Sequence, residues 1–212
     1  MNINIPSEIK TIIKDLSYTV DNIGRSKDLV ILFEDKYILK ISTDITRLKK
    51  EYDVNEFLNG KINSSKNIVF LTVDETAYYL RTSINGYSLI HDRYINNPNL
   101  LVDALVKTVN VLRSLDKYSD INYLSEESIG NDFVHGDLCL PNIYFDENNN
   151  FLGFIDLSAA GLGDRWLDYS WMLWSLEYNL KTKEYHNILL NKLNIKFDEN
   201  KYNYYIPIEY RK

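Results

Sequence analysis

The chain has 212 residues, 45% of them hydrophobic and 25% charged, so it can bury a core and does not have the composition of a disordered protein. Its net charge of −6 at pH 7 argues against an electrostatic nucleic-acid binder and is compatible with a cationic substrate. The single cysteine, Cys139, excludes an internal disulfide and any metal site built from several cysteines.

The sequence shows neither a signal peptide nor a membrane-spanning segment. The first ten residues lack the basic region and long apolar run of a signal peptide. No segment approaches the roughly 18 consecutive apolar residues that a membrane-spanning helix requires. We therefore expect a cytoplasmic protein without a membrane partner.

The first 84 residues are rich in strand-like segments. Pro6 stands where a first helical position is expected, and apolar residues at helical spacing predict a helix over 6–16. Asp44 offers an N-cap to a second helix over 44–58. The segments rich in Val, Ile, Tyr and Phe predict strands at 17–22, 28–34, 36–42, 67–73 and 77–83.

Three polar residues in this half are candidate phosphate-binding groups. Ser26 lies in a Gly–Ser loop between strands, which can close over phosphates, although an ordinary hairpin loop has the same appearance. Lys40 lies within an apolar strand, where a lysine usually points to solvent. Glu51 lies on the second helix, and a strand lysine paired with a helix glutamate holds the α- and β-phosphates in kinases. A surface-exposed Glu51 is the alternative.

Asn85-Gly86 interrupts the strand pattern, and we place a lobe boundary there. This divides the chain into a nucleotide-binding lobe, 1–84, and a catalytic and substrate-binding lobe, 85–212. The second lobe begins with a long helix that Asn97 caps and Pro98 starts. After a polar loop and the central stretch described next, further helices are expected at 164–178, 182–193 and 198–210.

Four polar residues gather in the stretch 133–156: His135, Asp137, Asn142 and Asp156. A hairpin should return Asp156 close to Asn142, at the same end of one sheet as Asp137. Oxygen ligands of this kind suit Mg²⁺. The spacing alone leaves alternatives open: a metal hydrolase site, a turn role for Asp156, or a His135 that merely satisfies a buried carbonyl.

The run HGDLCLPN followed by GFID resembles the signature of the aminoglycoside phosphotransferase family, and its motif is most similar to that of the 3′-phosphotransferases that act on kanamycin. The similarity continues through GDRWLDYSW and a C-terminal Tyr-Tyr-Ile. It implies an α+β, bilobal, protein-kinase-like fold. The N-terminal lobe would be an antiparallel sheet with a helix, and the C-terminal lobe would be mainly helical with a catalytic-loop hairpin.

The same resemblance implies a phosphotransferase that moves the γ-phosphate of ATP or GTP, with Mg²⁺, to a hydroxyl of an aminoglycoside antibiotic. Asp137 would orient the acceptor hydroxyl, and Asn142 and Asp156 would ligate Mg²⁺. His135 would support the loop, and Cys139 would be a packed loop residue. The implied nucleotide contacts are Ser26, Lys40, Glu51 and the backbone around Ser83 and Ile84.

The chain is a short and atypical example of this pattern. The family's acidic loop position is Leu140 here, and its Gly-Arg is Ser158-Ala159. The acidic candidates for binding a small cationic substrate are Glu177 and Glu209. The alternatives are a kinase for another small hydroxylated metabolite or antibiotic, and a non-catalytic nucleotide-binding homologue. We expect a monomer or dimer and no nucleic-acid partner.

Overall fold

The computed structural model describes residues 5–21, 28–118, 130–207 and 210. Within them the helices are α1 (Ser7–Ile12), α2 (Ile45–Leu58), α3 (Asp92–Ile95), α4 (Pro98–Leu115), α5 (Trp166–Leu180), α6 (Glu184–Leu193) and α7 (Glu199–Tyr205). The strands are β1 (Tyr18–Asp21), β2 (Leu29–Phe33), β3 (Tyr37–Ser42), β4 (Asn67–Val73), β5 (Thr76–Thr82), β6 (Tyr87–Ser88), β7 (Asp132–Val134), β8 (Ile143–Phe145), β9 (Phe151–Phe154) and β10 (Gly161–Gly163). Single 3₁₀ turns are η1 (Leu140–Asn142) and η2 (Leu157–Ala159).

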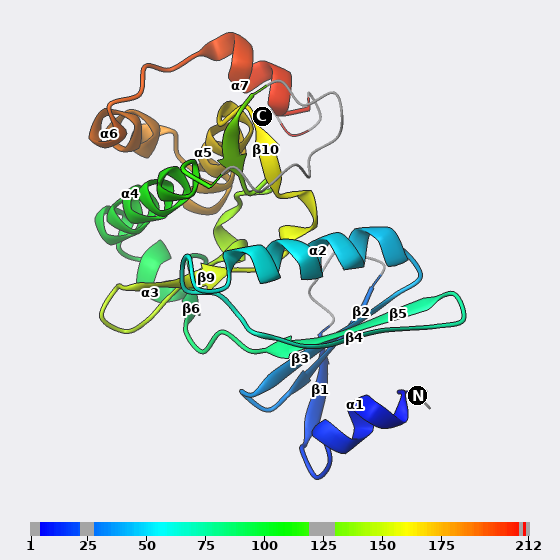
Figure 1. Cartoon of the computed structure of the whole chain (residues 1–212). Coiled ribbons are helices and arrows are strands. Elements are labelled where there is room, and N and C mark those ends of the chain that lie inside the picture. The colour runs from blue at the N-terminus through cyan, green and yellow to red at the C-terminus, as the bar shows by residue number, and fades with distance from the viewer. Residues whose placement is uncertain (1–4, 22–27, 119–129, 208–209, 211–212) are drawn as a thin grey trace.

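The first part of the chain is a five-stranded antiparallel sheet in the order β1-β2-β3-β5-β4. Alternation along each strand gives the sheet two different faces. One face packs Leu39 and Leu80 against Ile9 of α1. The other face packs Tyr79 against Leu48 of α2. Figure 1 shows α1 and α2 on opposite sides of the sheet, with α2 on the side that faces the helical part of the molecule.

Helix α2 begins where the sequence predicts, because the Asp44 carboxylate accepts a hydrogen bond from the Arg47 N–H at 3.0 Å. Its buried stripe includes Leu48, Glu51 and Leu58, which follow one another at helical spacing. Leu58 belongs to the large apolar core of the helical part. The helix therefore connects the sheet to the rest of the molecule and holds Glu51 between them.

The helical part is built around α4. Asn97 caps it through the Leu100 N–H, Pro98 occupies the first turn, and its apolar face is fully buried against α5 and α6. Two small sheets lie beside it: β7 with β10, and β6-β8-β9. The α+β fold with a sheet part and a helical part is as predicted, whereas the proposed boundary between residues 84 and 85 stays a prediction.

Several predicted details are wrong. The first helix ends at Ile12 rather than residue 16, where Asp15 adopts a left-handed φ of 66°. The last helix ends at Tyr205, before Pro207, rather than at residue 210. Strand β7 pairs with β10 and so does not share a sheet with β8 and β9, because the short loop after it turns the chain away. Within the described residues no helix has the length and apolar character needed to cross a membrane.

Candidate active site

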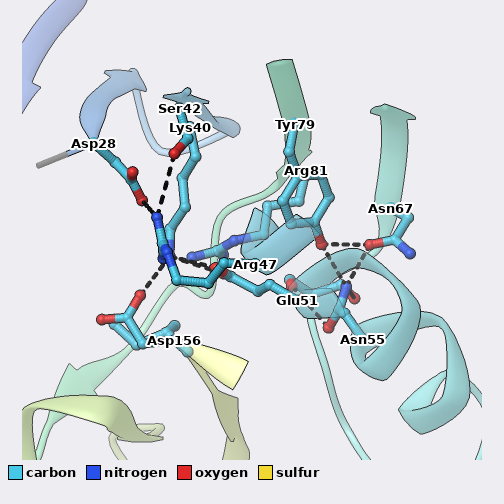
Figure 2. Close-up of polar contacts among 12 residues, drawn as sticks. Asp28, Lys40, Ser42, Arg47, Glu51, Asn55, Asn67, Tyr79, Arg81 and Asp156 are labelled. Atoms are coloured by element: carbon cyan, nitrogen blue, oxygen red, sulfur yellow. Dashed lines mark hydrogen bonds and ion pairs between the residues drawn. The ribbon is translucent and has the colours of Figure 1, made fainter. Parts of the chain in front are cut away.

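The side chain of Lys40 links the sheet to both of its neighbouring elements. Its Nζ donates to the two carboxylate oxygens of Glu51 on α2 at 2.8 and 2.9 Å, and it also contacts the carboxylate of Asp156. Lys40 and Glu51 are only 6% and 2% exposed. Figure 2 shows Lys40 between the two acids. The solvent-facing alternative for Lys40 and the surface alternative for Glu51 are therefore wrong.

The charges of this group depend on one another. Burial alone would lower the pKa of Lys40, but the negative charges of Glu51 and Asp156 outweigh it and raise that pKa above its ordinary value. Burial likewise disfavours the charged form of Asp156, yet the cations Lys40 and Arg81 hold the pKa of Asp156 below its ordinary value. The site therefore keeps the Lys40 ammonium and the Asp156 carboxylate ionised at neutral pH.

The loop after β7 places Asp137 and Asn142 together. The Asn142 side-chain amide donates to both the carbonyl and the carboxylate of Asp137, each at 3.0 Å. His135 is fully buried, and its Nε2 lies 3.0 Å from the Ile155 carbonyl while its Nδ1 accepts from the Asp137 N–H at 3.3 Å. Both ring nitrogens are thus engaged in holding the loop, which leaves the imidazole no free nitrogen for proton transfer.

Helix α5 fixes the loop after β7 through hydrogen bonds that its side chains accept. The buried Asp168 carboxylate accepts from the N–H groups of His135 and Gly136, each at 2.8 Å, and burial raises the pKa of Asp168 to about 7. Ser175, two turns further along α5, accepts from the Leu140 N–H at 3.0 Å. Gly136 has a φ of 84°, and a Cβ there would collide with the Ala159 carbonyl. The loop conformation therefore depends on a glycine at this position.

The β8–β9 hairpin returns Asp156 to this loop, as the sequence predicts. The Ile155 N–H donates to the Asn142 carbonyl at 3.0 Å, which fixes the residue before Asp156 beside the loop. Asp156 itself adopts a left-handed conformation with φ of 58°, and half of its side chain, 51%, is exposed. Asp156 therefore turns out of the hairpin toward Lys40 with a carboxylate accessible to a ligand.

A cavity of about 640 Å³ has Ile155, the residue before Asp156, in its wall. Its walls come from the sheet, from the segment after β5 and from the β8–β9 hairpin; they include Leu32, Ile38, Arg81, Ser83, Ile84, Tyr144 and Ile155. The Ser83 N–H is occupied by the Lys36 carbonyl at 2.9 Å, so it extends the β3–β5 pairing. The cavity therefore combines apolar side chains, among them Ile38 and Ile155, with the cation Arg81 and the segment of Ser83 and Ile84.

Comparison with known proteins agrees with this geometry. The model of the phosphotransferase enzyme family matches residues 130–198. A probable aminoglycoside 3′-phosphotransferase of Lactococcus lactis is 28% identical, over 88% of each chain. The structure of the aminoglycoside phosphotransferase APH(3″)-Id from Streptomyces rimosus superposes with a TM-score of 0.74 and 17% identity, over 93% of each chain. The chain is therefore similar to aminoglycoside phosphotransferases, in sequence along most of its length and in fold.

A third comparison concerns a family structure with bound ligands. The streptomycin–ATP ternary complex of APH(2″)-IIa has a TM-score of 0.62 to this chain and 14% identity, over 96% of this chain and 87% of that one. At this identity the likeness establishes the fold alone.

The residues present fit the magnesium ion that the family implies. The Asn142 amide nitrogen is turned to Asp137, which leaves its carbonyl oxygen available, and Asp156 offers an accessible carboxylate. In the described parts of the chain no three His, Cys, Asp or Glu side chains form a closed metal site. Such a sparse oxygen set suits Mg²⁺, which retains waters and bridges substrate phosphates.

Not every predicted family residue joins this site. Ser26 and Glu209 lie outside the described residues. Glu177 faces α6, with its carboxylate 3.6 Å from Lys183 and 3.9 Å from His186. Cys139 packs beside the loop, where burial and the neighbouring Asp137 raise its thiol pKa, so it stays protonated. Its predicted packing role agrees with this environment.

The sequence interpretation missed Arg81. This residue ends the apolar run of β5 and looks like an ordinary strand-end cation. Its register partner is Ile38, two residues before Lys40, and it lines the cavity. The signal that would have revealed it is the alternation of β5, which places Arg81 on the same face as Tyr79 and Lys40 once β3 and β5 are paired.

Proposed function

We propose that the chain is a phosphotransferase that moves the γ-phosphoryl group of ATP or GTP to a hydroxyl of an aminoglycoside. The observation that carries this proposal is the buried Lys40, which contacts Glu51 and also Asp156, the residue that follows Ile155 of the cavity wall. Few protein groups are needed for phosphoryl transfer beyond cations on the phosphates, metal ligands and a carboxylate at the acceptor. All three lie together here, which a protein that only binds nucleotide would not require.

In this proposal the oxygen of the acceptor hydroxyl bonds to the γ-phosphorus, and the bond from that phosphorus to the leaving nucleoside diphosphate breaks. Asp137 accepts the proton that the hydroxyl loses. The Asn142 amide, at 3.0 Å from the Asp137 carboxylate, orients it. Asn142 and Asp156 would hold Mg²⁺, which would supply positive charge against the transferring phosphates. Lys40 binds the α- and β-phosphates, and Glu51 positions Lys40.

The base of the nucleotide is assigned to the cavity. Ser83 and Ile84 contribute backbone and side-chain atoms to its wall, and no described residue accepts from the Ile84 N–H, so this donor can serve the base. Ser26 is proposed to cover the β-phosphate. Residues 1–84 would then bind the nucleotide and residues 85–212 the acceptor. Nucleoside triphosphates and Mg²⁺ are supplied in the cytoplasm, where we place the reaction.

The acceptor side rests on fewer contacts. Glu177 and Glu209 are the proposed partners of substrate ammonium groups. Glu177 has only long contacts, 3.6 Å to the Lys183 ammonium and 3.9 Å to the His186 imidazole, so a cationic substrate can compete for the carboxylate. Leu140, which replaces the family's acidic loop residue, is fully buried and offers no charge. This last observation favours, as the second candidate, a kinase for a different small hydroxylated compound.

A panel assay tests the proposal. Nucleoside diphosphate release with Mg²⁺ is measured for kanamycin, neomycin, streptomycin and a set of hydroxylated metabolites without amino sugars, and mass spectrometry checks each acceptor for one added phosphoryl group. Release stimulated by an aminoglycoside, with a phosphorylated product, supports the proposal. Stimulation by another hydroxylated compound alone would move the assignment to the second candidate. Nucleotide binding without any phosphorylated product would point to the non-catalytic homologue.

A further inference from the structure

Arg81 is a cation that the proposed reaction does not yet use. Its side chain is 3% exposed and lines the cavity. Of the five N–H donors of a guanidinium, one Nη1 donor reaches the Thr82 carbonyl, at a long 3.3 Å. Among the described residues no direct ion pair joins Arg81 to a carboxylate, and the charge of Asp156 acts on it only through space. The remaining N–H donors of the guanidinium can therefore serve a ligand in the cavity.

The place of Arg81 on the sheet identifies which part of a nucleotide it would meet. In the sheet, Ile38 pairs with Arg81 and Lys40 pairs with Tyr79. Arg81 therefore lies two residues along the strand from the level of Lys40, a distance of about 7 Å, in the direction of Ser83 and Ile84. Lys40 is the proposed phosphate contact and Ile84 the proposed base contact. Arg81 therefore stands between them on the inner wall, beside the base.

A second polar atom on this wall also lacks a partner. The Ser83 hydroxyl is buried and has no hydrogen-bond partner among the described residues. The Thr82 carbonyl, an acceptor at the same wall, already receives the Arg81 donor. The hydroxyl can donate or accept, so the Arg81 guanidinium is the group on this wall that can only donate, and it suits a ligand edge that presents acceptors.

Guanine and adenine differ at the base edge that would face Arg81, the edge that carries N7 and the substituent at C6. Guanine presents two acceptors there, O6 and N7, and an arginine guanidinium can bind both at once. Adenine presents its N6 amino group, a donor, in the place of O6, so it would set donor against donor beside Arg81. We propose, on the basis of the transferase function above, that Arg81 reads O6 and N7 of the base and makes the enzyme select GTP over ATP.

Equilibrium binding tests this selection without any acceptor. With Mg²⁺ present, GTP, ITP and ATP compete against a fluorescent nucleotide on the full chain. ITP carries O6 and N7 but lacks the 2-amino group of guanine, so it isolates the edge that Arg81 faces. We expect GTP and ITP to bind about 10- to 100-fold more tightly than ATP, the range expected for a bidentate arginine–guanine contact. Removal of N7 in 7-deaza-GTP should weaken binding to an intermediate level.

Substitutions at Arg81 separate base reading from other roles of the cation. Arg81→Met keeps the length and removes the donors, and it should bring GTP, ITP and ATP to similar affinities. Arg81→Lys keeps the charge but loses the two-pronged geometry, so it should retain only part of the preference. Circular dichroism and thermal melting confirm folding, and the wild-type comparison of ITP with ATP needs no variant at all.

Three outcomes would overturn the inference. Equal binding of ITP and ATP to the wild type, or tighter ATP binding, would show that Arg81 does not read the base. An Arg81→Met variant that weakens all three nucleotides equally would assign the guanidinium to the phosphates. The failure of every nucleotide to bind would overturn the proposed function as well, whereas binding without preference overturns only the choice of base.

Discussion

The two ends of the candidate active site hold their charges in different ways. At the nucleotide end, Lys40 and Glu51 are buried and make short contacts of 2.8 and 2.9 Å. Glu177, which is proposed to bind the acceptor, makes long contacts of 3.6 and 3.9 Å with Lys183 and His186, and two-thirds of the Lys183 side chain, 66%, is exposed. Buried charges need fixed partners, whereas exposed charges gain little from theirs.

This difference explains why the reaction is easier to assign than the acceptor. The groups proposed to bind phosphates are arranged by the core of the fold, since α2 packs Glu51 against the sheet and α5 holds the loop of Asp137. The proposed acceptor contact Glu177 is partly exposed, so its charge can be replaced at little cost in stability. Substitutions at the two ends should therefore differ in size, and the following experiments measure that difference.

The largest effect is expected at Asp137. The Asp137→Ala variant should lose at least about 100-fold in kcat while nucleotide affinity stays near that of the wild type, because only a contact made during transfer is removed. Steady-state kinetics and nucleotide titration measure the two quantities separately. Asp103→Asn, which alters a carboxylate paired with Lys192 on the surface, is the matched control and should be silent. Activity that survives Asp137→Ala would remove Asp137 from its proposed role.

The next largest effect concerns the buried pair. Lys40→Met should lower kcat/KM for the nucleotide by at least about 10-fold and reduce the free energy of unfolding by about 3 kcal/mol, because Glu51 is left buried without its cation. The double variant Lys40→Met with Glu51→Leu should recover part of the stability but none of the nucleotide use. Urea denaturation and nucleotide kinetics report the two results. A Lys40→Met variant with unchanged nucleotide dependence would contradict the phosphate role.

A smaller effect, on pH dependence, is expected from His135. Burial lowers the pKa of His135, so below its ordinary pKa of about 6.5 the unfolded chain binds a proton that the folded chain does not. His135 should therefore contribute a fall in the free energy of unfolding as pH decreases below that value, by at most about 1.4 kcal/mol per pH unit, while Asp168, with its pKa raised to about 7, contributes in the opposite direction. Urea denaturation of the wild type and of His135→Gln across this range measures both slopes, and their difference is the contribution of His135.

His186 supplies the matched control for this pH experiment. Burial lowers its pKa as well, and its Nε2 lies 2.9 Å from the Leu173 carbonyl, away from the loop of Asp137. His186→Gln should also reduce the slope but leave the pH dependence of kcat unaltered. Protonation of His135 would instead break the hydrogen bond that its ring accepts from the Asp137 N–H. The kcat should therefore decrease as the pH is lowered in the wild type and in His186→Gln, but not in His135→Gln. Identical kinetic profiles in both variants would contradict this role.

The sequence predicted those parts of the site that lie close together along the chain. Asp137, Asn142 and Asp156 are joined by one loop and one hairpin, so their approach follows from local rules, and the Ile155–Asn142 backbone bond confirms it. Lys40 and Glu51 belong to adjacent elements, and the resemblance to kinases supplied their pairing. The motif residues that fall in the described chain therefore meet as expected.

The position of Arg81 could not be predicted in the same way. It depends on β3 pairing with β5 rather than with β4, and a one-residue change in register would turn Arg81 to the other face of the sheet. The pairing of β7 with β10 is likewise set by tertiary structure, because β10 has three residues, two of them glycine, and no strand pattern of its own. Contacts between distant segments of weak pattern need the folded chain.

The smallest effect is expected at Glu177. Glu177→Gln should raise KM for a cationic acceptor by no more than about fivefold, because an ion pair at a partly exposed carboxylate contributes about 1 kcal/mol or less. The KM of the nucleotide and the free energy of unfolding should stay at wild-type values. Glu184→Gln, an exposed acid at the start of α6, is the control for a general loss of negative charge. If Glu177→Gln instead lowers acceptor affinity as strongly as Lys40→Met lowers nucleotide use, the acceptor end holds its charges as firmly as the nucleotide end, and the contrast drawn between them is wrong.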